Sequence, residues 1–527
     1  MTPTMPALDR ILTSPWVLAA ALVVSFFWQL GSVPLYDLDE GAFTEATREM
    51  LASGNYITPH KDGEPRYDKP ILIYWLQAAS AKLFGLNELA LRLPSALAAS
   101  LWLIVLWRFV RERLDARTAT VAALIMALTL EVSLIAKAAV ADAVLNLFLV
   151  LSFFDIYRYF VQPNGRLAAR AFLWMGLGFL TKGPVAVFFP VVASLLFFLS
   201  EGAFKHWRRA ALNPWGWLVF LLVALPWYVA IYLDNGPGFF ESFFLRHNLG
   251  RFEGAMQGHS GSPFYYFIVL PLILLPFTGW FLRLLPTLRR AWADPLDRFG
   301  WIWFVLVFVF FSFSGTKLPH YLLYGATPLF VLMARHRDLL RSRWLGFAPP
   351  VLFFLVMLFL PEAVKWASAH AHKIHQAAMF EDAEMVLGGA YRVATALGLV
   401  LVVMVALWRR VAVWQGLVLV GFIQTAVVFG ALVPRVFEVM QEPVKEAALL
   451  ARRLDLPTVV YRTNMPSFSV YRRAITPERP PASGDLVFLR IDKLDRFAQE
   501  YPHLHRAVLF RRGAVALVKV TAAPDNG

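Results

Sequence analysis

The sequence predicts a polytopic α-helical membrane protein with a small α/β domain at its C-terminal end, and three observations support this fold class. Hydrophobic residues make up 58% of the 527 residues and charged residues only 16%, whereas a soluble globular chain carries about 25% charged residues. Apolar segments long enough to cross a bilayer recur along the chain. The last part of the chain, after about Pro434, differs in composition from the rest.

Thirteen apolar segments are candidate membrane spans of about 17 to 25 residues each. The first runs from Trp16 to Leu30 and passes Ala19–Ala21 without a break, so we expect an uncleaved span and not a secretory signal. The thirteen segments are centred near Val24, Ile104, Leu128, Phe148, Leu173, Phe189, Val223, Leu274, Val307, Phe330, Leu355, Leu399 and Leu419.

The loops between these segments alternate in charge. Every second loop is rich in arginine, and the positive-inside rule makes these loops cytoplasmic. The other loops hold the acidic residues and most of the histidines. Thirteen spans then place the N-terminus in the cytoplasm and the tail outside. The arginine-rich loops contain Arg108–Arg117, Arg158–Arg170, Lys205–Arg209, Arg283–Arg298, Arg335–Arg343 and Arg409–Arg410.

The charge and the absence of cysteine exclude several function classes. The net charge is +14, from 50 Lys and Arg against 36 Asp and Glu. Because these charges lie between apolar runs, they indicate topology signals and contact with anionic lipid, not binding to nucleic acid. With no cysteine, the chain has no disulfide framework, zinc-thiolate site or cysteine nucleophile.

Residues 434–527 predict a separate α/β domain that follows a membrane domain of residues 1–433. We expect this domain to be a cap or docking module and not a catalytic one. Its predicted elements are a helix at 441–454, a strand at 457–462, a short helix near 468–473, a strand at 485–491, a helix at 493–501 and a hairpin at 505–520.

The first outer loop, residues 36–88, is the most informative segment. Gly41–Ala52 predicts a helix lying in the membrane interface, with an apolar stripe opposite a polar face that includes Glu45 and Arg48. A second amphipathic helix is expected to begin at Pro70. The ionisable residues that this arrangement places at headgroup depth are Asp37, Asp39, Glu40, Asp68 and Lys69.

Further ionisable residues interrupt apolar sequence at the same face. Ionisable groups in or beside a membrane are costly and indicate function by default, so we expect roles for Lys137, Asp142, Lys182 and Lys317. Basic and acidic groups together suit transfer from a phosphate, because cations neutralise the leaving phosphate while a carboxylate acts as a base or stabilises a cationic sugar. A divalent metal site is also predicted, formed by Asp68 with His247 or His259.

Two strings in the first outer loop, YDLDEGAFTEATREMLASGNYITPH and RYDKPILIYW, resemble the first periplasmic loop of the GT-C membrane glycosyltransferases that use polyprenyl-phosphate sugars. The likeness covers most of residues 35–332. It is strongest for the aminoarabinose transferases of lipid A modification and weaker for the protein O-mannosyltransferases. The resemblance implies a bacterial inner-membrane enzyme whose active site and C-terminal domain face the periplasm. The likeness continues through LGFLTKGPVAV, FFLRHNLGRFEGAMQGHSGSPFYYFIVLPLILLPFTGW and FSFSGTKLPHYLLYGATPLF.

The resemblance also implies roles for individual residues. Asp39 matches the essential acidic residue of the family's Asp-Glu motif, whose second position is Glu40, and both are expected to be catalytic. Asp142 matches a further acidic residue of the active-site cavity. Lys69 matches the lysine that contacts the donor phosphate, and Tyr321 falls where the family has a tyrosine near the donor site.

Other matches are looser. Arg66, Lys317 and Arg246 are expected to help hold the donor phosphate, and His247 or His259 falls near a proposed metal ligand. The sequence also departs from the family. Arg66-Tyr-Asp-Lys-Pro is one residue shorter than the usual Arg-Tyr-Phe-Glu-Lys-Pro, with Asp68 in place of glutamate, and His320 replaces a threonine.

These features favour an enzyme that moves a sugar, such as an aminoarabinose-like pentose, from a polyprenyl-phosphate donor to lipid A or another envelope acceptor. The alternative within the enzyme class is an O-glycosyltransferase acting on protein or on another glycan. A lipid-linked sugar flippase is a weaker alternative, since no internal repeat is visible and the charges gather at one face. A pure binding module does not explain the ionisable residues spread over several outer loops.

Overall fold

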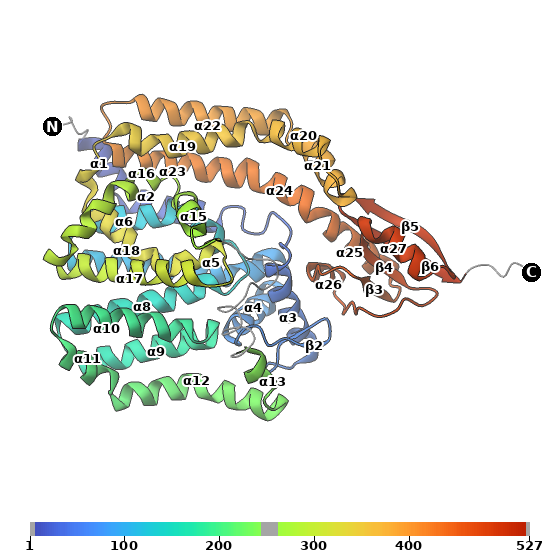
Figure 1. Cartoon of the computed structure of the whole chain (residues 1–527), viewed down its shortest axis with the longest axis horizontal. Coiled ribbons are helices and arrows are strands. Elements are labelled where there is room, and N and C mark those ends of the chain that lie inside the picture. Colours follow the sequence, from blue (N-terminus) through green and yellow to red (C-terminus); the bar gives the residue numbers. More distant parts are fainter. Residues whose placement is uncertain (1–5, 244–261, 523–527) are drawn as a thin grey trace, which may run out of the picture.

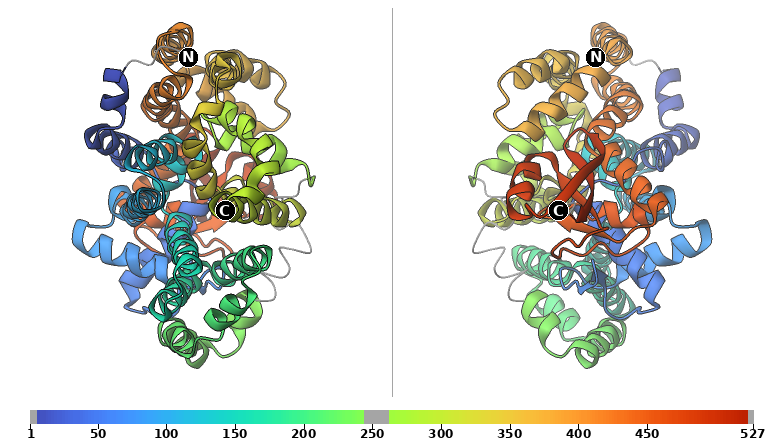
Figure 2. Two further views of the ribbon diagram at one scale, coloured as in Figure 1. Left: turned by 90° about the vertical axis from the view of Figure 1, so that its left-hand side faces the viewer. Right: turned by 90° about the vertical axis from the view of Figure 1, so that its right-hand side faces the viewer.

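The computed structural model describes residues 6–243 and 262–522. Figure 1 shows long helices lying side by side along the longest axis, with a small β-sheet beyond one end of this bundle. The two end-on views of Figure 2 show that the sheet covers the middle of that end. The helices α3 and α4 lie at the same end as the sheet.

The helical bundle accounts for most of the chain, and the η labels mark short 3-10 or π segments. Its elements are α1 (Pro6–Leu12), α2 (Pro15–Leu22), η1 (Val23–Phe27), α5 (Glu88–Arg113), α6 (Ala116–Leu128), α7 (Leu130–Ala136), α8 (Asp142–Val161), α9 (Gly165–Lys182), α10 (Val185–Ser200), α11 (Phe204–Ala211), α12 (Pro214–Asn235), α13 (Gly238–Phe240), α15 (Tyr265–Ile273), α16 (Thr278–Leu284), η3 (Leu285–Ala293), α17 (Pro295–Phe313), η4 (Pro319–Gly325), α18 (Thr327–Arg335), η5 (Arg337–Leu339), α19 (Arg343–Leu358), α20 (Leu360–Ala369), α21 (Ile374–Val386), α22 (Gly389–Leu407), α23 (Val413–Val427), η6 (Val428–Leu432) and α24 (Val433–Met440).

Each of the thirteen predicted spans contains helix, but the helices differ in length. Within the described ranges, six helices are long and apolar enough to cross a membrane, and nine spans result if each bent helix pair counts as one. Two shorter apolar helices, α2 with η1 and α10, add to these. The remaining predicted spans are α9 and the nine-residue α18. A multi-pass helical protein is therefore confirmed, and the number of thirteen stays a prediction.

The first outer loop folds into α3 (Asp39–Ser53), a hairpin of β1 (His60–Lys61) with β2 (Glu64–Pro65), and α4 (Leu72–Phe84). Gly54 ends α3 in the left-handed region, at φ +73°, where a residue with a Cβ is strained. The polar face expected for α3 is present but does not face water. Glu45 and Arg48 are buried and ion-paired at 2.6 Å, because the C-terminal domain packs on this side of α3.

Arg92 is the residue that ties the first outer loop to the bundle. It lies in α5, which begins after the N-cap Asn87, and its side chain is buried. Its guanidinium donates to the carbonyls of Leu30, Val33 and Pro34 at 2.6–3.1 Å and to both carboxylate oxygens of Glu40 at 2.7 and 2.8 Å. Since a buried charge needs a full set of partners, this arrangement fixes the path of the chain before α3.

The C-terminal part of the chain forms a four-stranded mixed sheet with helices on both faces. The strand order is β3-β4-β6-β5, with β3 parallel to β4 and the other pairs antiparallel. The central strand β4 is buried on both faces, as its continuous apolar run requires. The elements are α25 (Glu442–Leu454), β3 (Thr458–Tyr461), α26 (Ser467–Arg472), β4 (Leu486–Arg490), η7 (Ile491–Lys493), α27 (Leu494–Glu500), β5 (Leu504–Arg512) and β6 (Val515–Ala522).

This C-terminal domain is docked on the first outer loop by specific polar contacts. The carboxylate of Asp37 accepts hydrogen bonds from the backbone N–H of Ser467 at 3.0 Å and from its hydroxyl at 2.5 Å. The hydroxyl of Tyr471 accepts from the N–H of Leu35 at 2.7 Å and donates to Glu88 at 3.0 Å. Glycine at position 41 permits the close approach, because a Cβ there would lie 2.7 Å from the nitrogen of Ser467.

Replacing Arg92 by alanine is expected to destabilise the whole protein. The change leaves the buried carboxylate of Glu40 without its partner, and breaking a buried pair in this way costs about 3–5 kcal/mol. The matched control is Arg111→Ala on the same helix, where the guanidinium contacts the ring of Trp107 and, among the described residues, has no ion pair. The measurement is the apparent melting temperature of each purified variant in detergent. Equal melting temperatures for the two variants would contradict this role for Arg92.

Candidate active site

A cavity of about 680 Å³ lies where the first outer loop, the bundle and the C-terminal domain meet. Its polar lining contains six basic and four acidic side chains, which gives the cavity an excess of positive charge. These are Lys61, Arg66, Lys69, Arg92, Lys137 and Lys182 with Asp39, Glu40, Asp68 and Asp142. Its volume is within the range of small-molecule sites, about 300–1,000 Å³.

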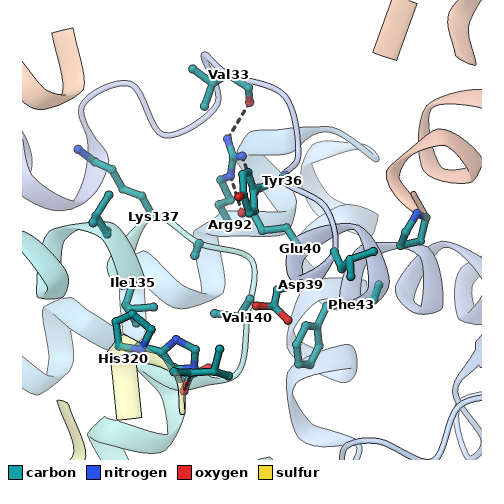
Figure 3. Close-up of a pocket in the computed structure, with 18 of the residues that line it drawn as sticks. Val33, Tyr36, Asp39, Glu40, Phe43, Arg92, Ile135, Lys137, Val140 and His320 are labelled. Atoms are coloured by element: carbon teal, nitrogen blue, oxygen red, sulfur yellow. Dashed lines mark hydrogen bonds and ion pairs between the residues drawn. The ribbon is translucent and has the colours of Figure 1, made fainter. Parts of the chain in front are cut away.

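Glu40 lines the cavity, but all its acceptor capacity is engaged within the protein. Besides Arg92, its carboxylate accepts from the backbone N–H of Tyr36 at 2.9 Å and from that of Ala139 at 2.6 Å. Figure 3 shows Arg92 and Glu40 joined at the edge of the cavity. Glu40 therefore holds three chain segments in place, and its catalytic role stays a prediction.

Asp39 is the exposed carboxylate of the first outer loop within the cavity. It begins α3, where the helix dipole favours a negative charge. Figure 3 shows its side chain between Val140 and Phe43, directed into the cavity. Its charge acts on both His320 and Arg66. Asp39 is thus available to a bound molecule in a way that Glu40 is not.

A second polar cluster surrounds Asp142, the first residue of α8. Its Oδ1 accepts from the ammonium of Lys182 and from the hydroxyl of Tyr324, each at 2.6 Å. The imidazole of His320 lies 3.5 Å from the same oxygen. Burial lowers the pKa of His320, and the negative charges of Asp142 and Asp39 oppose that shift. Asp142 is thus held by fixed partners and is oriented within the cavity wall.

Two of the basic residues predicted to hold the donor phosphate, Arg66 and Lys69, lie together on the side of the cavity formed by the first outer loop. Arg66 is in contact with Asp68 at 3.2 Å, donates to the carbonyl of Ala42 at 2.6 Å and stacks over the ring of Phe43 at 4.8 Å. Lys69 is the next residue after Asp68, and its ammonium donates to the carbonyl of Asp68 at 3.0 Å. Lys69, Arg66 and Tyr321 all line the cavity.

Lys317 does not line the cavity, in contrast to its predicted phosphate contact. Its ammonium is buried and donates to the carbonyls of Ser312 and Ser314 at 2.8 and 2.9 Å. The last carbonyls of a helix lack partners within the helix, and Lys317 satisfies those at the end of α17. The neighbours Thr316 and Leu318 line the cavity instead.

Three predicted site residues, Arg246, His247 and His259, lie outside the described residues. Among the residues the structure does describe, no group of three or more His, Asp or Glu side chains could hold a metal ion. Asp68, the remaining predicted ligand, is engaged with Arg66. The metal site therefore stays a prediction, and nothing in the geometry depends on it.

One wall of the cavity is apolar and is formed by bundle elements. It contains Leu30, Leu134, Ile135, Phe429, Val433 and Phe437. Lys137 lies on this side, with its ammonium 3.4 Å from the centre of the Phe429 ring and 3.3 Å from the carbonyl of Val24. The cavity thus combines a cationic side with an apolar side, as an amphiphilic ligand with a charged head requires.

The prediction of the site residues omitted several members of this site. Lys182 interrupts apolar sequence and is expected to be functional. Its partner Tyr324 is one of many aromatic residues in an apolar stretch, so no sequence pattern distinguishes it. Asn464 and Pro466 of the C-terminal domain also line the cavity. They are more than 400 positions from Asp39, and no local pattern connects residues so far apart.

Known protein families and known proteins match large parts of this chain. Residues 68–232 match the family described as dolichyl-phosphate-mannose-protein mannosyltransferase. An uncharacterized protein of Aquifex aeolicus is 31% identical over 346 residues, 64% of this chain and 77% of that protein. The undecaprenyl phosphate-alpha-4-amino-4-deoxy-L-arabinose arabinosyl transferase of Aeromonas hydrophila is 31% identical over 378 residues, 68% of this chain and 67% of the transferase.

The fold is also that of a solved structure. The crystal structure of ArnT from Cupriavidus metallidurans bound to undecaprenyl phosphate aligns with a TM-score of 0.80 at 21% identity, covering 97% of this chain and 98% of that one. The likeness extends over the bundle and the C-terminal domain alike. The chain therefore belongs to the family of GT-C membrane glycosyltransferases that includes the undecaprenyl phosphate-aminoarabinose arabinosyl transferases.

Proposed function

We propose that this protein transfers an aminoarabinose-like sugar from undecaprenyl phosphate to lipid A, at the outer face of a bacterial inner membrane. The observation that carries the proposal is the cavity, which brings the exposed carboxylate of Asp39, a cationic side and an apolar wall into one space. The sugar and the donor lipid are those named for the related transferase of Aeromonas hydrophila and for the ArnT structure. The positive-inside rule supports the outward orientation.

In this proposal the phosphate of the donor lies on the cationic side, against Lys69 and Arg66, and the polyprenyl chain leaves along the apolar wall. The bond between the anomeric carbon and the phosphate oxygen breaks, and its electron pair stays on the phosphate. Lys69 neutralises the second negative charge that the phosphate then carries. A fixed cation placed where charge develops lowers the barrier without reorganising at the moment of reaction.

The acceptor oxygen attacks the opposite face of the anomeric carbon, so the configuration at that carbon inverts. Asp39 lies where it can orient the sugar or the nucleophile. Asp142, held by Lys182 and Tyr324, forms the fixed polar surface against which the sugar packs. If the acceptor is a phosphate of lipid A, the nucleophile is already anionic and no general base is needed. If the acceptor is a hydroxyl, Asp39 is the candidate base.

The C-terminal domain completes this site by holding the loop that carries Asp39. Asp37 lies two residues before Asp39 and is bound to Ser467 through both of its carboxylate oxygens. Burial raises the pKa of Asp37 to about 7, although the two hydrogen bonds from Ser467 act in the opposite direction. We therefore assign Ser467 as a positioning residue for Asp39.

A metal role for Asp68 with His247 or His259 remains a separate proposal. It is tested by treating the purified enzyme with a chelator and then restoring magnesium, manganese or zinc. Loss of transfer that one of these metals restores would support the site, and unchanged transfer would remove it.

Lys69→Ala is expected to reduce transfer by about ten- to a hundredfold, because a hydrogen bond to a charged group contributes about 1.5–3 kcal/mol. The measurement is the transfer of radiolabelled sugar from a synthetic undecaprenyl-phosphate donor to lipid A in proteoliposomes. Lys205→Ala is the matched control, because Lys205 is an exposed lysine of α11, and α11 lies at the opposite end of the bundle (Figure 1). Equal rates for both variants would exclude the contact between Lys69 and the donor phosphate. Movement of the donor lipid across the membrane without any sugar transfer would indicate a flippase and exclude the glycosyltransferase function.

The pH dependence of the rate distinguishes the two kinds of acceptor. For a phosphate acceptor we expect a rate that is nearly constant between about pH 5.5 and 8, since no base has to be deprotonated. The native enzyme and Asp39→Glu are compared in the same proteoliposome assay. A steep fall below about pH 6 that moves with Asp39→Glu would contradict the phosphate acceptor and indicate a hydroxyl, as in protein or other glycan acceptors.

Ser467→Ala is expected to lower kcat by up to about tenfold, which corresponds to about 1.4 kcal/mol, with little change in the KM for the donor. The reason is that the lost hydrogen bond positions the segment of Asp39 and not the phosphate side. Ser483→Ala is the matched control, since Ser483 lies in the same domain and its hydroxyl accepts from the N–H of Ala522, far from Asp37 in the sequence. Equal kinetic constants for the two variants would contradict the positioning role.

The docking contact also has a pH signature that serves as a second readout. Since the pKa of Asp37 is raised from 3.8 to about 7, the docked state favours the protonated carboxyl. The contribution of Asp37 to the free energy of unfolding is therefore present at acidic pH and is lost as the pH rises through 7. The melting temperature of the native protein is expected to fall more between about pH 5 and 8 than that of Asp37→Asn.

A further inference from the structure

A second large cavity lies apart from the candidate active site, between α8, α9, α10, α11 and α12. It is a groove of about 760 Å³. Its lining is almost entirely apolar and aromatic, and it opens to the outside past Leu212 and Trp217, which are 69% and 49% exposed. Figure 1 shows α11 at the end of the bundle opposite the C-terminal domain.

The length of the groove matches one leaflet of a membrane. Along α9 its lining extends from Leu167 to Phe179, and twelve residues of α-helix span about 18 Å. One leaflet contributes half of a hydrocarbon core that is about 30 Å thick. A groove of this length, open along one side, suits an acyl chain that runs parallel to the helices.

Among the described polar side chains that line the groove, all but one have a partner within the protein. The buried carboxylate of Asp155 accepts from Arg158 at 3.1 Å, from Arg170 at 3.0 Å and from the indole N–H of Trp174 at 2.9 Å. Arg158 also pairs with Glu112 at 2.8 Å. Glu112 also pairs with Arg113 at 2.7 Å, so every charged group of this cluster has a partner of opposite charge.

Arg208 is the exception. It lines the groove and is exposed, and within the part of the chain that the structure describes it has no acidic partner. The helix that carries it is fixed in place, because the indole of Trp207 donates to the hydroxyl of Ser194 at 3.0 Å and the hydroxyl of Tyr159 donates to the carbonyl of His206 at 3.2 Å. An uncompensated guanidinium thus stands at the mouth of an apolar groove, at a defined position.

We propose that this groove binds one anionic phospholipid, with an acyl chain along α9 and the headgroup phosphate at Arg208. Charge complementarity selects this occupant over a neutral lipid, since a guanidinium recognises phosphate by charge-assisted hydrogen bonds. The aromatic side chains of Trp207 and Trp217 at the same end are typical of the membrane interface. The site is separate from the transfer reaction and is independent of the acceptor.

The test is to titrate the detergent-solubilised full-length protein with phosphatidylglycerol or phosphatidylcholine and to count bound lipid by native mass spectrometry. We expect one copy of phosphatidylglycerol to bind more tightly than phosphatidylcholine. Arg208→Gln is expected to weaken phosphatidylglycerol binding about fivefold, the effect of one basic residue at a membrane surface. Ala171→Leu, which fills the groove, is expected to weaken the binding of both lipids.

Arg209→Gln is the matched control, because Arg209 has the same charge on the same helix but does not line the groove. Phosphatidylglycerol binding that responds equally to Arg208→Gln and Arg209→Gln would overturn the proposal, as would equal binding of the two lipids. Displacement of the bound lipid by undecaprenyl phosphate would assign the groove to the donor chain instead. Sugar transfer by Arg208→Gln is expected to equal that of the native enzyme.

Discussion

The buried ion pair between Glu40 and Arg92 is the interaction on which the candidate active site depends. The single carboxylate of Glu40 holds three chain segments, namely α5 through Arg92, the start of the first outer loop through Tyr36, and the segment before α8 through Ala139. Asp39 is the neighbour of Glu40, and Asp142 follows Ala139 by three residues. The relative position of the two acids is therefore set by one residue. A buried carboxylate is tolerated only when all its oxygens are paired, which makes this geometry rigid.

The ionisable residues of the cavity divide into those that hold the structure and those that face a ligand. Three ion pairs, Glu40 with Arg92, Asp68 with Arg66, and Asp142 with Lys182, account for most of the charge. These pairs fix the walls in advance. The excess of positive charge and the exposed carboxylate of Asp39 then meet a donor that carries a phosphate and a sugar. Such preorganisation is how a fixed site stabilises charge that develops during a reaction.

The two ends of the bundle are built for different tasks. At one end the C-terminal domain covers the polar face of α3, and its residues Asn464 and Pro466 form part of the cavity wall. At the other end arginines gather around α8, α9 and α11, and an apolar groove opens beside them. In three dimensions, some of the topology signals of the sequence form a paired cluster around Asp155, while Arg208 lines the groove without an acidic partner among the described residues.

The sequence by itself determined the helical membrane class, the positions of the C-terminal strands, the family resemblance, and Asp39, Lys69 and Asp142 as cavity residues. These depend on local patterns of hydrophobicity, turns and motifs, which are read within a few tens of residues. Tertiary structure alone decided that Glu40 holds the loop, that Lys317 caps a helix, and that Asp142 is bound by Lys182 and Tyr324. It also decided that the C-terminal domain closes the cavity. The reason is that the environment of an ionisable side chain is set by its partners, and for Asp142 and Asp37 these partners lie from 40 to more than 400 residues away.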